Sequence, residues 1–197
     1  MNIREELERR LGAAGPIQLS DVEVDPAQIR ALMINEIVPA DPAQDFYGSC
    51  GDAYLSTALP LLRQGGLPVE SIGDALRMGI YITNAVKVPK ETSAVPPESI
   101  ELSLPWLEQE IALFPNLRVI MLCGDVARKM FNRITRKATK RNVIPSGATY
   151  RLRGTPFHYG SIRVLPSYII TGGNLLIEKG KTAMIAEDIA VMAAIIR

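Results

Sequence analysis

Short apolar runs rich in β-branched residues alternate along the chain with longer segments in which apolar residues recur every three or four positions. The short runs cover residues 29–34, 80–83, 117–123 and 161–165. Runs of this kind are typical of buried strands, and the periodic segments between them are typical of amphipathic helices. Strands that alternate with helices predict a parallel sheet covered on both faces. We therefore expect the α/β class, as a three-layer α/β/α fold with a central four-stranded, mainly parallel sheet.

The helices are predicted from the apolar spacing and from residues typical of helix ends. They are expected over residues 1–12, 48–62, 72–78, 104–111, from 125 onward and 182–196. Pro105 is expected in the first turn of its helix, where a missing N–H is tolerated. Asp125 and Thr182 are expected to cap the helices that they begin. Residues 145–160 are predicted to form a loop or a hairpin.

Length and composition favour one domain over residues 1–197, with an N-terminal helical extension over residues 1–28. With 197 residues and 47% hydrophobic content, the chain is long enough for one well-buried core. No apolar run is long enough to span a membrane, and the charged start does not resemble a signal peptide. Two cysteines, Cys50 and Cys123, are too few for a disulfide framework or a four-cysteine metal site. We expect a cytoplasmic, monomeric protein without metal or other cofactor.

The net charge of +1 conceals a strongly basic segment between Val126 and Arg153. This segment holds nine basic residues and no acidic one. They are Arg128, Lys129, Arg133, Arg136, Lys137, Lys140, Arg141, Arg151 and Arg153. Such a segment is suited to gripping a stretch of phosphate backbone, or it forms a solvated helix face and loop.

Polar residues gather where the predicted strands end. In open α/β sheets, ligands bind at the carboxyl ends of the strands. The residues expected at this edge are Asn35, Glu36, Asp41, Asp45, Phe46, Tyr47, Thr83, Asn84, Gly124, Pro166 and Ser167. An aromatic ring stacks on a planar heterocycle, an amide pairs with its edge, and a carboxylate positions water. The edge is therefore suited to a nucleobase.

Four segments, in order, resemble the uracil-DNA glycosylase superfamily from about Ala31 to the C-terminus. Phe46-Tyr47-Gly48-Ser49-Cys50-Gly51 is similar to the family's Phe-x-Gly-x-x-Gly segment, and Tyr81-Ile82-Thr83-Asn84 to its Tyr-Ile-Thr-Asn strand end. Residues 104–111 and 119–124 resemble the next helix and strand, and Pro166-Ser167 falls at the family's His-Pro-Ser loop. The resemblance implies the family's fold and a DNA glycosylase that hydrolyses the N-glycosidic bond of uracil or another damaged base.

The resemblance also implies a role for each candidate residue. Phe46 and Tyr47 would bind the flipped base, and Asn84 would hydrogen-bond to its edge. Glu36, or else Asp41 or Asp45, would orient the attacking water. DNA would be the partner, held by Ser167 and by residues of the basic segment. Those residues are Arg128, Lys129, Arg133, Lys137, Lys140 and Arg141.

Two motifs depart from the family pattern. If Pro39 is aligned with the family's proline, Ile37 falls on the acidic position and Glu36 lies one residue early, which on a strand points a side chain to the opposite face. Leu165 replaces the histidine that donates a hydrogen bond to the uracil carbonyl, a loss that costs about 10²–10³ in rate. His158 is the chain's only histidine and the remaining candidate for that role.

Other functions remain open at this point. The chain could keep the fold and the base pocket without hydrolysis, as a protein that binds nucleic acid or a nucleobase. It could also be a metabolic α/β enzyme, although neither common Gly-rich phosphate loop is present. Leu175 and Leu176 could fill the gap left by a flipped base, or they could pack a loop.

Overall fold

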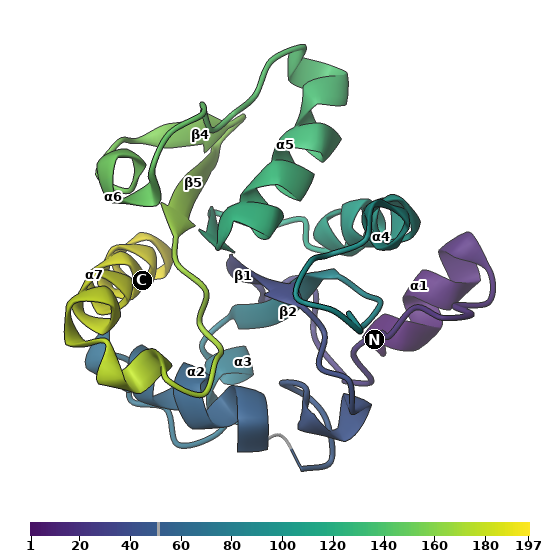
Figure 1. The fold of residues 1–197 in the computed structure, drawn as a ribbon, viewed down its shortest axis with the longest axis horizontal. Coiled ribbons are helices and arrows are strands. Elements are labelled where there is room, and N and C mark those ends of the chain that lie inside the picture. The colour runs from purple at the N-terminus through teal and green to yellow at the C-terminus, as the bar shows by residue number, and fades with distance from the viewer. Residues whose placement is uncertain (51) are drawn as a thin grey trace.

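The computed structural model describes residues 1–50 and 52–197, and its centre is a five-stranded sheet (Figure 1). The strands are β1 (Ala31–Ile37), β2 (Ile80–Val86), β3 (Val119–Cys123), β4 (Phe157–Tyr159) and β5 (Ile162–Ser167). Their order is β2-β1-β3-β5-β4, and β1, β2, β3 and β5 are parallel. The prediction of four strands missed β4, a three-residue strand antiparallel to β5. It is short and has no buried residue, so it carries no apolar run to reveal it.

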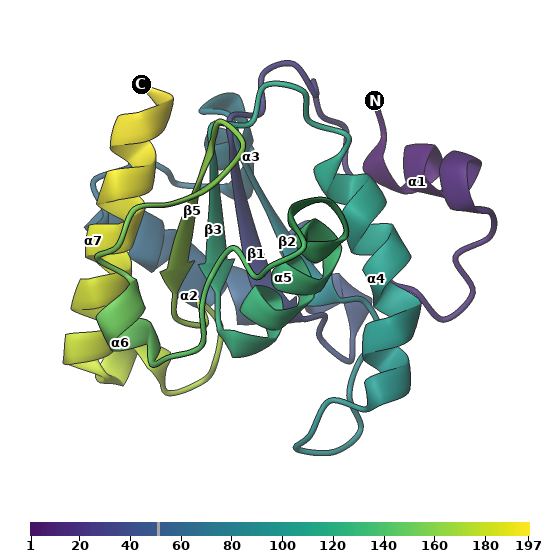
Figure 2. The same cartoon turned by 90° about the horizontal axis from the view of Figure 1, so that it is seen from above.

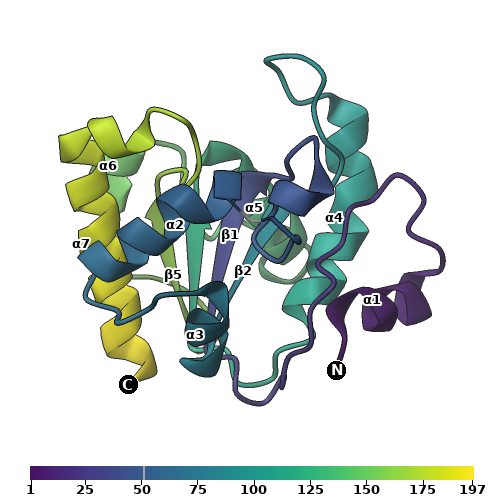
Figure 3. The ribbon, with the colours of Figure 1, turned by 90° about the horizontal axis from the view of Figure 1, so that it is seen from below.

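Helices cover both faces of the sheet, which confirms the expected three layers (Figures 1 and 3). One face packs against α1 (Ile3–Leu11), α4 (Pro97–Ile111) and α5 (Asp125–Thr139). The other packs against α2 (Asp52–Gln64), α3 (Ile72–Arg77) and α7 (Lys179–Ile196). Successive residues of β1 alternate between the two layers: Leu32 and Ile34 pack on the α4–α5 side, Ala31 and Met33 on the α2–α7 side.

Two strands extend further toward their carboxyl ends than the apolar runs indicated. β1 begins at Ala31 and reaches Ile37, and β2 continues to Val86. Polar residues lie inside both extensions, where Asn35 pairs with Asn84 in register. The prediction ended the strands too early because buried amides interrupt the apolar pattern although the backbone ladder continues.

Three expectations about helix starts were wrong. Pro105 lies inside α4, which begins eight residues earlier at Pro97. An interior proline costs about 3 kcal/mol, a cost offset here by burial of the neighbouring Trp106 and Leu107. The cap residues are Gly124 and Glu178 instead of Asp125 and Thr182.

The N-terminal region lies beside the α4–α5 layer (Figure 2). Within residues 1–28 only Ile3–Leu11 is α-helical, and Asn2 and Glu23 form an isolated bridge. Ile3 and Leu7 are fully buried, so this segment completes the core on that face. Residues 145–160 contain α6 (Thr149–Leu152) and the first strand of a hairpin. No helix in the described part of the chain is long and apolar enough to cross a membrane.

Candidate active site

The carboxyl ends of β1 and β2 bring two asparagines together. The Nδ2 of Asn35 donates to the Oδ1 of Asn84 at 3.1 Å and to the Oγ1 of Thr171 at 3.1 Å. The Nδ2 of Asn84 in turn donates to the Oδ1 of Asp45 at 2.9 Å. Both asparagines are buried. We call these four residues, Asn35, Asp45, Asn84 and Thr171, the amide cluster.

Asp45 stands out in this cluster because it is acidic and largely buried. Its Oδ1 also accepts the N–H of Phe46 at 2.8 Å. Burial raises the pKa of the Asp45 carboxyl above its usual range, although these hydrogen bonds act in the opposite direction.

Glu36 lies on the other face of the sheet from the amide cluster. It alternates with Asn35 along β1, and its Oε1 accepts the N–H of Val126 at 3.0 Å, at the start of α5. The helix N-terminus favours a carboxylate there. Burial nevertheless raises the pKa of Glu36 above its usual range, and the nearby Asp125 adds to this effect.

Gly124 provides the space that Glu36 occupies. Its φ is +116°, and a Cβ at this position would lie 2.3 Å from the Oε1 of Glu36. We expect Gly124→Ala to lower the free energy of unfolding by more than about 1 kcal/mol, because it combines backbone strain with this clash. Urea denaturation would measure the change. Gly154→Ala is a suitable control because a Cβ there meets no atom within 4 Å; equal losses in both variants would contradict the prediction.

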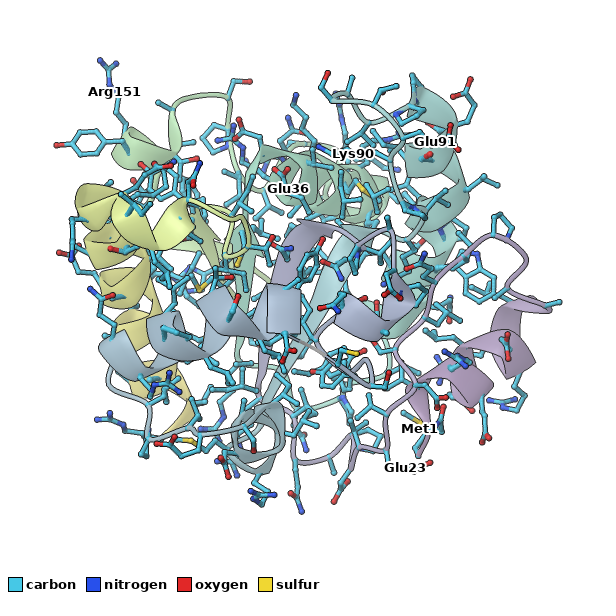
Figure 4. All side chains as sticks on the ribbon, turned by 60° about the horizontal axis from the view of Figure 1, so that its bottom comes forward. Met1, Glu23, Glu36, Lys90, Glu91 and Arg151 are labelled. Atoms are coloured by element: carbon cyan, nitrogen blue, oxygen red, sulfur yellow. The ribbon has the colours of Figure 1, made fainter. Side chains whose placement is uncertain are left out.

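A cleft of about 590 Å³ opens beside Glu36. Its wall includes Glu36, Ser167 and Thr171, and its rim includes Tyr150 and Lys181. Figure 4 shows Glu36 and Arg151 at one end of the molecule, with Met1 and Glu23 at the opposite end. Because Thr171 belongs both to this wall and to the amide cluster, the cluster adjoins the cleft without opening into it.

The two expected base-stacking aromatics are packed into the protein. Phe46 is 1% exposed and lies against Tyr54, with ring centroids 5.1 Å apart. Tyr47 stacks on Tyr81 at 5.4 Å, and its hydroxyl accepts the N–H of Ile82 at 2.9 Å. Burial raises the pKa of the Tyr47 phenol well above its usual range. Neither ring is among the described residues that line the cleft.

A buried ion pair between Lys87 and Glu110 contacts the backbone of Asn84. The Nζ of Lys87 is 2.6 Å from the Oε2 of Glu110, and both side chains are at most 2% exposed. The same Nζ donates to the backbone oxygen of Asn84 at 2.9 Å. Glu110 also accepts hydrogen bonds from the hydroxyls of Tyr81 at 2.7 Å and Thr83 at 2.9 Å.

The hydroxyl of Ser167 is hydrogen-bonded to an acidic side chain of α7. Its Oγ donates to the Oδ2 of Asp188 at 2.6 Å, and Asp188 pairs with Arg153 at 3.0 Å. Burial raises the pKa of Asp188, against the effect of these two partners. Ser167 therefore reaches the cleft wall with its hydroxyl proton directed toward α7.

Most of the basic segment lies along α5, whose first residue, Asp125, lines the cleft. Arg128 lies in the first turn, whereas Lys140 follows the last, about 18 Å further along the axis at 1.5 Å per residue. Arg128, Arg133 and Lys137 pair with Asp125, Glu101 and Glu108. Lys129, Lys140 and Arg141 are exposed, and no carboxylate of the described residues pairs with them.

The remaining candidates fall at different places. Asp41 is exposed and accepts the N–H of Ala43 at 3.0 Å, as a turn residue does. His158 pairs in register with Arg163, at the end of the sheet opposite the cleft, so it cannot act for the missing histidine. Leu165 is buried in the core. Leu175 is buried as well, whereas Leu176 is 41% exposed.

Sequence reasoning missed three residues that shape this region: Thr171, Glu110 and Asp188. None follows a predicted strand directly, and each meets its partner across more than twenty residues of chain. The only sequence signal was a carboxylate on the apolar face of a helix, since Glu110 lies between Leu107 and Ile111 and Asp188 beside Ile189.

The chain is similar in sequence to known proteins. The family model of the uracil DNA glycosylase superfamily matches residues 33–172, which is more than half of the chain. The Type-5 uracil-DNA glycosylase of Thermus thermophilus is 36% identical over 81 residues, a stretch that covers 39% of this chain and 37% of that protein. The matched family region contains both Glu36 and the amide cluster. The chain belongs to the uracil DNA glycosylase superfamily.

Proposed function

We propose that this protein is a DNA glycosylase that hydrolyses the N-glycosidic bond of uracil or another damaged base. The observation that carries the proposal is the placement of a partly buried carboxylate, Glu36, and a buried amide, Asn84, at neighbouring strand ends beside one cleft. A carboxylate suits the orientation of water, and an amide suits the edge of a base.

In the proposed reaction, Asn84 hydrogen-bonds to the edge of the flipped base. Glu36 accepts a hydrogen bond from the attacking water while the bond between the base and the sugar breaks. The raised pKa of Glu36 brings its proton affinity closer to neutral pH, which favours this role. Asp41 is a weaker candidate because it is exposed and already caps a turn.

Base binding requires an opening, because Asn84 is 2% exposed. The segment from Thr171 to Asn174 is the best candidate for the moving part. Gly172 and Gly173 are exposed, and a Cβ on either would meet no atom within 4 Å. One hydrogen bond from Asn35 to Thr171 ties the segment to the amide cluster. Movement of such glycine-containing segments commonly admits a substrate.

The DNA backbone would lie along the start of α5. Lys129 is exposed there and Arg128 lies beside the cleft, so these two are favoured over Lys140 and Arg141 at the far end. Arg133 and Lys137 would have to exchange their carboxylate partners for phosphate. The Ser167 hydroxyl now donates to Asp188, so it would have to release Asp188 before it could donate to a phosphate oxygen.

The reaction as proposed uses no metal or redox group. Some branches of the family hold an iron–sulfur cluster through cysteines, but this chain has only Cys50 and Cys123. Cys50 is exposed and Cys123 is buried in the core, so these residues do not fit such a cluster.

The test is a strand-cleavage assay on an end-labelled oligonucleotide with one uracil, followed by alkali. We expect Asn84→Ala to lower the rate of base release by about 10²–10³, the scale for losing one positioned hydrogen-bonding group. Asn142→Ala is the matched control, since Asn142 is exposed and far from the cleft. A folded wild-type protein that releases neither uracil nor hypoxanthine would contradict the proposal.

A binding protein of the same fold is the second candidate. Leu165 stands where the family's histidine would donate a hydrogen bond, and no histidine is near the described site. Salt-dependent DNA affinity without base release would favour this alternative.

A further inference from the structure

We propose that Asp45 and Asn35 fix the orientation of the Asn84 side-chain amide and so determine which base edge it accepts. The inference rests on the proposed function, and it assigns to these two residues a positioning role.

The hydrogen bonds in the amide cluster have a single direction. An ionised carboxylate only accepts, so Asp45 must face the Nδ2 of Asn84, at 2.9 Å. The amide of Asn35 is oriented in the same way, since its Oδ1 accepts the N–H of Ile170 at 3.4 Å. Its Nδ2 therefore points to the Oδ1 of Asn84, at 3.1 Å.

The reversed orientation of Asn84 would be unfavourable at both ends. Its Oδ1 would face the carboxylate of Asp45, and its Nδ2 would face the Nδ2 of Asn35. Burial of Asn35 and Asn84 makes such mismatches costly, because water has little access to replace their lost partners. Asp45 is itself held in place, since Phe46 beside it is in the core and donates to it at 2.8 Å.

A fixed amide accepts only one arrangement of donor and acceptor. The two contacts leave Asn84 with one N–H and one oxygen lone pair. Uracil offers a ring N–H beside a carbonyl oxygen, and cytosine offers a ring acceptor beside an amino group. Reading both edges in the same pose would require the amide to reverse. The orientation set by Asp45 and Asn35 therefore permits uracil and rejects cytosine.

The experiment compares wild type with Asp45→Ala on two single-stranded oligonucleotides, one with a single uracil and one with a single cytosine. Asparagine would not serve, because its oxygen could still accept from both Phe46 and Asn84. An alanine at position 45 removes the acceptor, so it no longer fixes Asn84. We expect the preference for uracil over cytosine in kcat/KM to fall about 10-fold or more, the scale of one bidentate base contact. Asp52→Asn, an exposed acidic residue at the start of α2, should leave the preference unchanged.

The preference separates positioning from stability. A merely structural role of Asp45 would lower both rates alike, and an unchanged preference in folded Asp45→Ala overturns the inference. If Asp45→Ala does not fold, Asn35→Ala tests the other contact by the same ratio. A wild type that releases uracil but shows no preference would overturn the inference alone, whereas a wild type that releases no base would overturn the proposed function as well.

Discussion

Replacing Glu110 by glutamine is expected to lower the free energy of unfolding by about 3–5 kcal/mol, the usual cost of removing one partner from a buried ion pair. The glutamine has nearly the shape of the glutamate, so the loss comes from the charge and not from a cavity. Lys87 would be left with its ammonium at most 2% exposed and without a carboxylate. Two hydroxyl donors, on Tyr81 and Thr83, would also face a weaker acceptor.

Urea denaturation followed through the single tryptophan, Trp106, measures this effect, since Trp106 lies on the same helix. The matched control is Glu108→Gln, which breaks the surface pair of Glu108 with Lys137. Such a pair contributes about 0–1 kcal/mol. Equal losses in the two variants would show that Lys87 does not depend on Glu110.

A double replacement distinguishes charge from packing. Lys87→Met combined with Glu110→Leu removes both charges together, and apolar replacements of buried ion pairs are often neutral or stabilising. We therefore expect the double variant to recover part of the lost stability, because the hydroxyls of Tyr81 and Thr83 still lose Glu110 as their acceptor. It also removes the hydrogen bond from Lys87 to the backbone of Asn84, so base release should remain slower than in wild type even when the fold is restored.

Glu36→Gln is expected to slow base release by about 10²–10⁴-fold, the range for a general base. The glutamine can still accept the N–H of Val126, so the side chain keeps its place while losing its basicity. In wild type, the rate should rise with pH as Glu36 loses its proton. Because burial raises its pKa, this rise should lie above the usual range of a glutamate.

The ionisation of Glu36 should lower the stability of the fold as pH rises, whereas it raises the rate of base release. The folded state holds the Glu36 proton more tightly than the unfolded state, so stability falls as pH rises between the two pKa values. Glu36→Gln should remove this fall while it removes activity. Glu5→Gln is the control, since it removes an exposed charge on α1. A Glu36→Gln protein with the wild-type rate and pH profile would contradict the role of Glu36.

The sequence predicted the three layers and the parallel strands, because the apolar pattern of a doubly covered sheet is local information. It ended β1 and β2 too early, where buried amides interrupt that pattern. It did not predict that Asn35 and Glu36 point to opposite faces, since both were expected at one edge of the sheet, although strand geometry implies this alternation. The sequence did not predict the partners of Asn84 and Asn35. Asp45, which binds Asn84, follows a turn, and Thr171, which binds Asn35, comes from a distant loop. Only the folded chain brings their side chains to β2 and β1.

Pro105 shows a second limit of sequence-based prediction, in which burial overrides local propensity. Local propensity placed it at a helix start, but burial of Trp106 and Leu107 keeps the helix continuous through it. Phe46 and Tyr47 show a similar limit at the site. A sequence motif identifies these aromatic residues, but it does not reveal how deeply they are packed.

The position of β2 at one end of the sheet gives Tyr47 and Lys87 a further consequence. A terminal strand presents free backbone groups to which another chain could add a strand, and that is a common route to aggregation. Here the N–H of Ile82 donates to the Tyr47 hydroxyl, and the Lys87 ammonium donates to the backbone oxygen of Asn84. Neither backbone group is then free to pair with another strand. Just beyond the strand, the N–H of Gln18 donates to the backbone oxygen of Lys87. The residues beside Asn84 thus also protect the sheet from pairing with a second molecule.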